Sequence, residues 1–405
     1  MTAAPRRPIT RTMDPVDAQY EAYPYPARDP ADEARRLITG SPSDPAEIDT
    51  LLFGGARDWS QPFRALSAGG GAGDALVMLA QKLADAGVAH TLTYLDRSKA
   101  ARAVAEARIA ARGLSGVRFV TGDLLEAAAL GPFDYIDCCG VLHHLPDPQA
   151  GFDALAAALA PGGGLGAMVY APYGRTGVYP LQAALAALTE GLAPADKLAV
   201  ARQVLAGLPP SNWFLRNDLL RDHRDSDAGL YDLLLHARDQ PFTADAVMAA
   251  VAAAGLSFAG FIEPARYAPE TWTQAPIPEL APPARAALAE RLAGGIKAHV
   301  FYAVKGPVKA AAPAPHLRPR LRGATAAQMA ANAGKPFTWR RDGAAHRLTL
   351  PREAAALVRL LDGRRRLGEV AQALRLDWLA FAAQFAPIHR TFSGHGLLLY
   401  SERFA

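Results

Sequence analysis

The sequence contains very little cysteine and no long apolar run. Its only two cysteines, Cys138 and Cys139, are neighbours in a chain of 405 residues, which excludes a disulfide framework and a cysteine-based metal site. No segment approaches the roughly 18 uninterrupted apolar residues of a membrane span, and the N-terminal segment MTAAPRRPITRTMDP lacks the apolar core of a signal peptide. We therefore expect a cytoplasmic protein without membrane contact.

Strong net charge is absent as well. The formal charge is +4, so composition argues little for or against a nucleic-acid partner. The charge is nevertheless uneven, because the segment from Lys305 to Arg341 carries eight basic residues and no acidic one. This segment therefore favours a nucleic-acid partner more than the net charge does.

Apolar runs of strand length recur from residue 63 onward. The expected strands lie at 63–68, 90–96, 117–122, 133–139, 164–171, 256–263 and 299–306. The accompanying segments at 74–87, 98–113, 148–160 and 243–255 are rich in Ala or Leu and have the length of helices. This alternation predicts an α/β domain with a mostly parallel sheet and helices on both faces.

Composition divides the chain into four expected parts. These are an N-terminal arm or lid at 1–60, the α/β domain at 61–306, a basic Ala/Pro-rich linker at 307–335 and a small winged-helix-like domain at 336–405. The arm contains Tyr20, Tyr23 and Tyr25. The linker is expected to be semi-extended, and the last domain to consist of three helices followed by a strand pair near Ser393 and Gly394.

A helical insertion interrupts the α/β domain at residues 172–240. It leaves the carboxyl end of the fifth expected strand, where open α/β sheets bind ligands. We therefore expect the insertion, rather than the C-terminal domain on its flexible linker, to decide which substrate reaches the reacting centre.

A glycine-rich loop and two aspartates occupy three successive strand ends. The loop Ser67-Ala-Gly-Gly-Gly-Ala-Gly73 follows the first strand and opens a helix, whose unpaired N–H groups can face a ligand. Asp96 ends the second strand 23 residues after Gly73, the approximate spacing of a carboxylate that accepts a ribose diol. Asp123 follows the third strand, where a polar side chain can meet an adenine amino group.

These segments resemble the class I family of S-adenosylmethionine (SAM)-dependent methyltransferases. The resemblance lies in LSAGGGAGD, TYLD, FVTGDLLE, FDYIDCCGVLHHLPDP and LAPGGGLGAMVYA, and it covers residues 63–171, with 243–306 matching in outline. It implies a Rossmann-like, seven-stranded, mostly parallel sheet and SAM as the cofactor. Where the family usually has an acidic residue that helps to hold the amino group of SAM, this chain has Ser67.

The resemblance also implies which residues hold the cofactor. Gly69, Gly71 and Gly73 approach the methionine part of SAM, Asp96 the ribose, Asp123 and Leu124 the adenine, and Gly140 and Val141 the sulfonium.

Methyl transfer from a sulfonium is an in-line displacement, which needs a base only if the acceptor is protonated. The candidate catalytic residues lie at the strand ends and in the insertion. They are His143, His144, Tyr173, His223 and His236. Packing at the rim of the site explains His143 and His144 equally well, and a simple loop anchor does so for Tyr173. For His223 and His236, surface ion pairs are the favoured interpretation. No metal is expected, because the two adjacent histidines lack a third ligand at suitable spacing.

Several acceptors fit this family. The helical insertion and the appended C-terminal domain favour a protein or peptide side chain, in a layout similar to that of bacterial protein lysine methyltransferases with a C-terminal winged helix. The alternatives are a small metabolite with the C-terminal domain mediating a homodimer, an RNA bound through the basic linker and Arg364–Arg366, and a non-catalytic SAM-binding regulatory module, prompted by Ser67. Methylation of an exocyclic base amine is disfavoured, because no Asn-Pro-Pro-aromatic or Asp-Pro-Pro-aromatic tetrapeptide follows the fourth strand.

Overall fold

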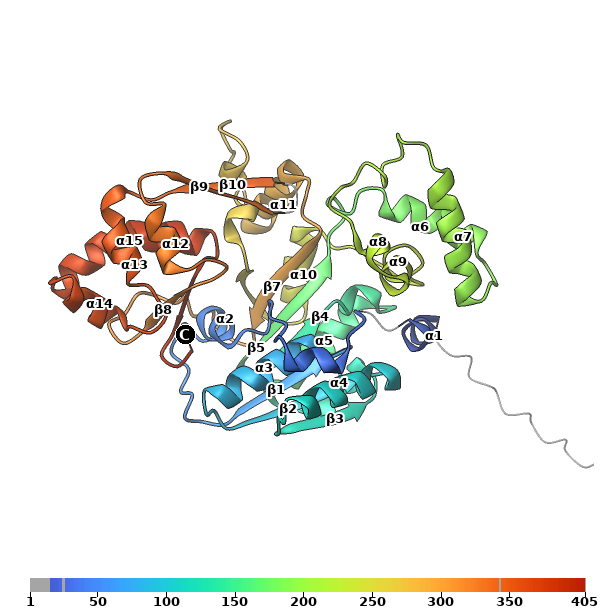
Figure 1. Cartoon of the computed structure of the whole chain (residues 1–405), viewed down its shortest axis with the longest axis horizontal. Helices are drawn as coiled ribbons and strands as arrows, with labels where there is room; N and C mark the ends of the chain where they lie inside the picture. Colours follow the sequence, from blue (N-terminus) through green and yellow to red (C-terminus); the bar gives the residue numbers. More distant parts are fainter. Residues whose placement is uncertain (1–14, 24–25, 342–343, 405) are drawn as a thin grey trace, which may run out of the picture.

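The computed structural model describes residues 15–23, 26–341 and 344–404 (Figure 1). Its centre is a seven-stranded sheet in the order β3-β2-β1-β4-β5-β7-β6. The strands are β1 Phe63–Ala68, β2 His90–Asp96, β3 Val117–Thr121, β4 Phe133–Cys139, β5 Leu159–Tyr170, β6 Ser257–Phe261 and β7 Ala298–Val304. All neighbours are parallel except β7, which is antiparallel to both β5 and β6. The expected Rossmann-like sheet is confirmed.

Helices cover both faces of the sheet, and each face has its own apolar core. One face carries α5 Pro148–Ala158, α10 Ala244–Ala253 and α11 Pro282–Ala293, and the other α2 Pro45–Leu52, α3 Asp74–Asp85 and α4 Lys99–Ala111. The strand order reverses between β1 and β4. A crevice is therefore expected at the carboxyl ends of these two strands.

The expected strands differ from the observed ones by a few residues at their ends. The largest difference is at β5, which begins at Leu159 rather than at Gly164. Leu159 pairs with Phe133 of β4 before a shift in register, and Gly164 pairs with Tyr135. The glycine-rich turn thus becomes part of the strand, because the chain bulges there without leaving the sheet.

The insertion contains four helices with an apolar core of their own. They are α6 Val178–Leu188, α7 Pro194–Gly207, α8 Asp222–Asp225 and α9 Asp227–Leu234. After α9 the chain returns to the sheet, where the Phe242 N–H donates to the Tyr170 carbonyl at 2.8 Å. The insertion therefore begins and ends at the carboxyl end of β5.

The C-terminal region is a small unit of helices and short strands, but the order of its elements corrects the sequence prediction. It contains β8 Arg318–Leu321, α12 Ala326–Ala331, β9 Pro336–Arg341, β10 Ala344–Thr349, α13 Ala355–Arg359, α14 Leu367–Ala373, α15 Trp378–Gly394 and β11 Leu398–Ser401. The strand pair expected near Ser393 and Gly394 is wrong. Helix α15 continues to Gly394 because Phe381, Phe385 and Phe392 form one buried stripe.

The hairpin of this region, β9–β10, precedes the helices, and β11 pairs with the distant β8. Both β8 and α12 lie in the segment that was expected to be a semi-extended linker. Leu317 and Met329, from this same segment, are buried in the core of the C-terminal region. That region therefore begins well before residue 336.

Buried polar contacts fasten the C-terminal region to α2. The Thr50 hydroxyl accepts from the Tyr400 N–H at 2.8 Å, and the Ser401 hydroxyl donates to Asp49 at 2.6 Å. Arg320 of β8 forms an ion pair of 2.8 Å with Asp44, which caps α2. Such buried contacts do not fit a domain that swings on a flexible linker.

The remaining elements are short. They are α1 Pro15–Ala22 and the single-turn helices η1 Pro30–Ala34, η2 Leu124–Ala129, η3 Leu142–His144, η4 Pro264–Tyr267, η5 Pro269–Thr271 and η6 Arg352–Ala354. Among the helices described, none combines the length and the apolar character that crossing a membrane requires.

Candidate active site

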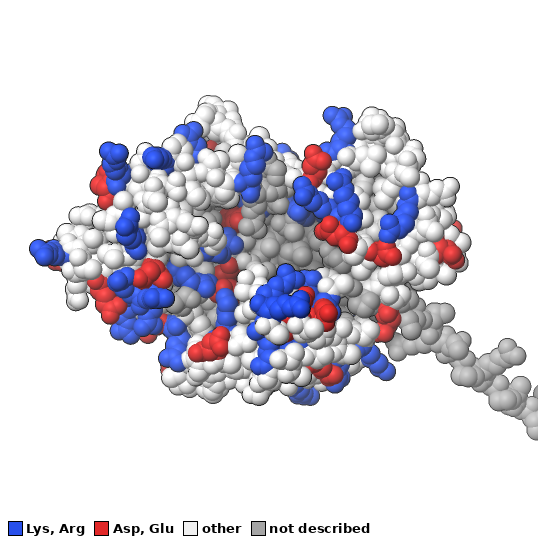
Figure 2. Space-filling model, viewed as in Figure 1, with Lys and Arg blue, Asp and Glu red and all other residues white. Residues whose placement is uncertain are grey.

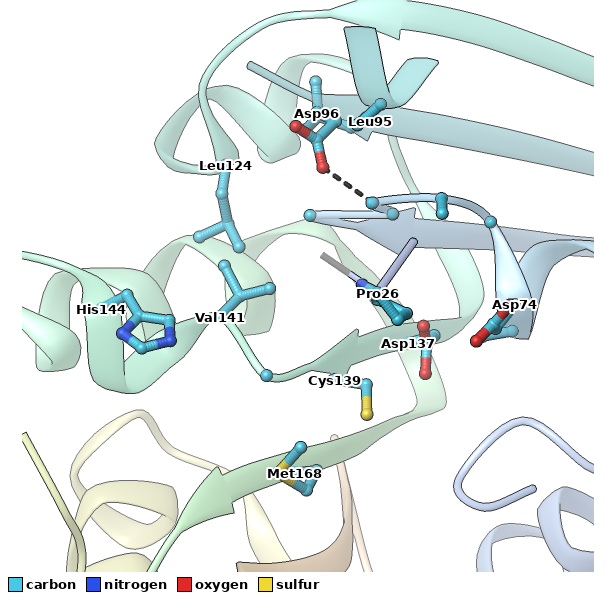
Figure 3. A pocket seen from close by; sticks show the side chains of 18 of the residues that line it. Pro26, Asp74, Leu95, Asp96, Leu124, Asp137, Cys139, Val141, His144 and Met168 are labelled. Carbon is cyan, nitrogen blue, oxygen red and sulfur yellow. Dashed lines mark hydrogen bonds between the residues drawn. The ribbon is translucent and has the colours of Figure 1, made fainter. Parts of the chain in front are cut away.

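A cavity of about 480 Å³ lies at the carboxyl ends of the central strands. The glycine loop after β1 and the ends of β2 and β4 line it (Figure 3). The N-terminal segment at 38–43 completes the wall. Its volume is in the range of small-molecule and cofactor sites. The cavity thus occupies the crevice that the reversal of strand order predicts.

The glycine loop fits the cavity because side chains are excluded from it. Gly69 has a φ of +67°, and a Cβ on this residue would lie 2.4 Å from a methyl group of Val141. A Cβ on Gly70 would lie 2.4 Å from the ring of Tyr94. The backbone of the loop can therefore contact a ligand directly, at the N-terminus of α3.

Asp96 is held in place by the backbone on both of its carboxylate oxygens. It accepts from the Gly71 N–H at 2.8 Å (Figure 3) and from the Ser98 N–H at 2.8 Å. The phenol of Tyr94 donates to the Gly71 carbonyl at 2.7 Å. The end of β2 and the glycine loop are thus one rigid wall of the cavity.

The other predicted cofactor residues also line the cavity, although their local structural roles differ. Asp123 caps η2 by accepting from the Leu125 N–H at 2.9 Å, and Leu124 is buried beside it. Gly140 has a φ of +78° and leads into Val141, which forms the floor. The structure therefore brings Gly69, Gly71, Gly73, Asp96, Asp123, Leu124, Gly140 and Val141 to one cavity.

A carboxylate that the sequence reasoning did not select also lines the cavity. Asp137 of β4 is only 4% exposed and accepts from the Ser43 hydroxyl at 2.8 Å. Its register neighbour on β1 is Ser67. The available signal was a charged residue inside the otherwise apolar end of the strand FDYIDCC.

At the end of the cavity opposite Asp137, His144 lies beside residues from β5 and the insertion. They are Tyr170, Asp232 and Arg238. The Nδ1 of His144 lies 2.6 Å from the Arg238 carbonyl oxygen, which can only accept. Nδ1 therefore carries the proton of the neutral ring, and Nε2 keeps its lone pair. Burial lowers the pKa of His144, so the ring is neutral at pH 7.

His236 lies directly behind His144. The two rings stack with centroids 3.7 Å apart and planes inclined by 15°. Burial, followed by the neighbouring His144, lowers the pKa of His236 to about 2. His236 is thus a neutral support for His144 rather than a residue of the cavity wall.

The other three predicted catalytic residues do not line the cavity. His143 is fully buried between His144 and Tyr170, and neither of its ring nitrogens forms a hydrogen bond with the described residues. The Tyr173 hydroxyl accepts from Arg291 of α11 at 3.3 Å. His223 packs on Phe214 inside the insertion, with ring centroids 4.8 Å apart.

The structure does supply the third ligand that the sequence lacked around the histidines. Ligand atoms of His144, Asp232 and His236 lie within 4.8 Å of one another, as do those of His143, His144 and Asp239. However, Arg175 already pairs with Asp239 at 3.0 Å. The Arg238 N–H donates to Nδ1 of His236, which places the proton of that ring on Nε2. These contacts favour a hydrogen-bonded cluster over a cation site.

The N-terminal arm joins the cofactor wall to the insertion. Glu21 of α1 accepts from the Ser98 hydroxyl at 3.1 Å and from the Lys99 N–H at 2.9 Å, at the start of α4. Tyr23 stacks on Tyr231 of α9 with centroids 5.2 Å apart. Of the other two tyrosines predicted to form a lid, Tyr25 lies outside the described residues, and the side chain of Tyr20 is not described either.

Comparisons with known proteins agree with this geometry. Residues 66–165 match a family model described as a methyltransferase domain. An uncharacterized protein from a Synechococcus strain is 32% identical over 264 residues, which cover 63% of this chain and 61% of the relative. The match thus spans less than two thirds of that relative.

Solved structures show the same fold over most of the chain. PKMT2 from Rickettsia typhi aligns with a TM-score of 0.63 and 15% identity, covering 91% of this chain and 78% of PKMT2. The structure of PKMT2 in complex with AdoHcy aligns with a TM-score of 0.62 and 14% identity, covering 89% and 76%. The chain thus contains a methyltransferase domain at residues 66–165 and shares the fold of PKMT2 over most of its length.

Proposed function

We propose that the chain transfers the methyl group of SAM to an amine on a protein or peptide side chain. The observation that carries this proposal is the pairing of a carboxylate and a neutral imidazole at the acceptor end of the cavity. Asp232, from the insertion, and His144, from the end of β4, have ligand atoms within 4.8 Å of each other. A carboxylate can hold an ammonium group, and a neutral imidazole can remove its proton.

The cavity residues suit the cofactor of the family. Asp96 is oriented to accept the ribose hydroxyls, Asp123 and Leu124 lie where the adenine would bind, and the glycine loop offers a surface without side chains. When bound, SAM supplies an electrophilic methyl group. The protein has to align the acceptor with that group and exclude water.

The acceptor end can prepare an amine for this attack. The Tyr170 hydroxyl donates to Asp232 at 3.1 Å, which orients the carboxylate toward an incoming ammonium. The Nε2 of His144 takes the proton, while Nδ1 keeps its hydrogen bond to the Arg238 carbonyl. The freed lone pair of the amine can then attack in line.

A protein acceptor is supported by the extent of the structural match. PKMT2, whose name denotes a protein lysine methyltransferase, aligns over 91% of this chain, far beyond residues 66–165 of the methyltransferase domain. This extent agrees with the layout of arm, insertion and C-terminal region noted in the sequence. A small metabolite is the second candidate, because the insertion and the arm both border the cavity.

The basic segment gives little support to an RNA acceptor. Arg320 pairs with Asp44, Arg322 with Glu263, and Arg318 donates to backbone carbonyls of the C-terminal region. On the face in Figure 2, basic and acidic side chains are intermingled. Arginines engaged within the protein are poorly placed to neutralise phosphates.

The test is to incubate the purified chain with methyl-labelled SAM and a size-fractionated lysate. We expect label in the large fractions, sensitive to protease, resistant to ribonuclease and recovered as methylated lysine after hydrolysis. Asp232→Asn is expected to lose this label, whereas replacing the exposed Asp225 of α8 by Asn is a matched control that keeps it. Label that enters only small molecules or only RNA would refute the protein acceptor.

A further inference from the structure

Asp137 is a buried acidic group whose contacts within the protein do not balance its charge. It lies on β4 at the cavity, 4% exposed. Its hydrogen-bond donor is the neutral hydroxyl of Ser43 at 2.8 Å, and the neutral Ser67 stands beside it on β1. Within the part of the chain that the structure describes, no basic side chain forms an ion pair with it.

Such a carboxylate is costly unless a cation reaches it. Burying an ionised carboxylate removes its hydration, and neutral hydroxyl groups replace that hydration only in part. Burial accordingly raises the pKa of Asp137 to about 6. A cationic ligand would restore the balance and stabilise the ionised form.

The position of Asp137 in the cavity selects one part of the cofactor. Asp96 and Leu124 lie at the adenosine end, and His144 at the acceptor end, whereas Asp137 and Asp74 lie together on a third side (Figure 3). Asp74 is already paired with Arg28 at 2.6 Å and with Arg108 at 2.7 Å. With adenosine and the methyl group assigned to the other two sides, the methionine tail falls on the side of Asp137.

We propose that Asp137 binds the α-ammonium group of the cofactor's methionine tail, so that a carboxylate on β4 does what Ser67 on β1 cannot do. Ser67 and Asp137 are register partners on adjacent parallel strands, so the two side chains border the same space. Ser43, which precedes α2, orients the carboxylate. The inference rests on the SAM assignment within the proposed function and is independent of the acceptor.

The test compares two ligands that differ in the methionine tail. S-adenosylhomocysteine carries the α-ammonium group, and 5′-methylthioadenosine lacks the whole amino-acid tail. Titration calorimetry of the full chain with each ligand measures the contribution of the tail. We expect Asp137→Asn to weaken S-adenosylhomocysteine at least tenfold, as for a charged hydrogen bond, and to change methylthioadenosine less than twofold.

The matched control is Asp134→Asn on the same strand. Asp134 lies at the other end of β4 and pairs with Arg57 and Arg64 outside the cavity. Both ligands should bind this variant as they bind the wild type. Wild-type affinity of Asp137→Asn for S-adenosylhomocysteine, or an equal loss for both ligands, would overturn the ammonium contact. A wild type that binds neither ligand would instead remove the SAM assignment, and the inference with it.

A second measurement needs no variant and decides the matter if Asp137→Asn does not fold. As the pH falls from 8 to 5, Asp137 gains a proton through its pKa of about 6. The affinity of the wild type for S-adenosylhomocysteine should therefore fall at least fivefold more than its affinity for methylthioadenosine. Equal pH dependence of the two ligands would contradict the inference.

The titratable groups around Asp137 do not change the expected difference between the two ligands as the pH falls. They are Tyr135 and Cys139 on β4, Glu47 on α2 and Asp74 on α3. Burial raises the pKa of Tyr135 and of Cys139 far above this range. Burial also raises the pKa of Glu47, which accepts hydrogen bonds from the hydroxyls of Ser41 and Tyr302. Glu47 is not among the residues that line the cavity, so we expect its protonation to affect both ligands alike.

Discussion

The insertion and the C-terminal region lie on opposite sides of the sheet in Figure 1, and they affect different ends of the same cavity. The insertion places Asp232 and Arg238 directly in the wall at the acceptor end. None of the described residues of the C-terminal region lines the cavity. This region packs on α2, and the residues just before this helix, Ser41 to Ser43, form the wall near Asp137. The insertion thus supplies side chains to the cavity wall, whereas the C-terminal region supports that wall indirectly through α2.

The largest effect is expected when residues 311–405, which include the C-terminal region, are deleted. We expect the truncated chain to lose cooperative unfolding, or to unfold at least about 10 °C lower, because Asp49 and Thr50 would lose buried partners at a cost of about 1–3 kcal/mol each. Thermal unfolding and SAM titration measure this. Leu379→Ser, on the exposed face of α15, is the control. A truncated chain that folds and binds SAM like the full chain would mean that the region is independent.

The next largest effect is a loss of turnover that we expect for a variant of His144 and not for a variant of His223. We expect His144→Gln to lower turnover by about 10²–10⁴-fold, since it removes the base at the acceptor end, with little change in SAM affinity. His223→Gln, at a ring that packs on Phe214 and does not line the cavity, should leave turnover unchanged. The measurement is initial rates at saturating SAM. Equal losses in the two variants would show that the insertion matters for its stability and not for one cavity wall.

Replacing Asp96 by Ala should have a smaller effect, confined to the cofactor end. The variant loses the carboxylate for the ribose and the bond to the Gly71 N–H, so SAM should bind more weakly by about 1–3 kcal/mol. Calorimetry gives this value, and circular dichroism verifies the fold. Unchanged affinity in a folded variant would remove Asp96 from the cofactor site.

The smallest effect is expected at Tyr173, which leaves β5 with the insertion but points to Arg291. Tyr173→Phe deletes an exposed hydrogen bond and should change stability by less than about 0.5 kcal/mol. Turnover should stay within twofold. A tenfold loss would place Tyr173 at the acceptor and extend the active site along this loop.

Sequence reasoning could predict which residues of the glycine loop and of the ends of β2 and β3 line the cavity, because their signals are local. Gly69 and Asp96 belong to strand-loop-helix segments whose geometry follows from neighbouring residues. Asp232 and Asp137 could not be selected in the same way. Asp232 reaches the cavity only through the packing of α9, and Asp137 becomes notable only when Ser43 and Ser67 are seen beside it.

The same physical reason explains the error in the C-terminal region. Strand β11 pairs with β8, and about 80 residues separate them in the sequence, so no local pattern announces the pair. The Ala/Pro composition before β8 suggested a linker, but Arg320 of that segment pairs with Asp44 beside α2, and Arg322 pairs with Glu263 of the α/β domain. The composition showed that the segment is polar, but it could not show which distant carboxylates its arginines pair with.

A crystal structure with S-adenosylhomocysteine bound would test the account most directly. We predict the ribose hydroxyls within 3.2 Å of Asp96, the α-ammonium group at Asp137, and the sulfur directed toward His144 and Asp232. The C-terminal region should remain packed on α2, outside the ligand contacts. A ligand bound in the reverse direction, with its amino-acid tail toward Asp232, or bound outside this cavity, would contradict the account.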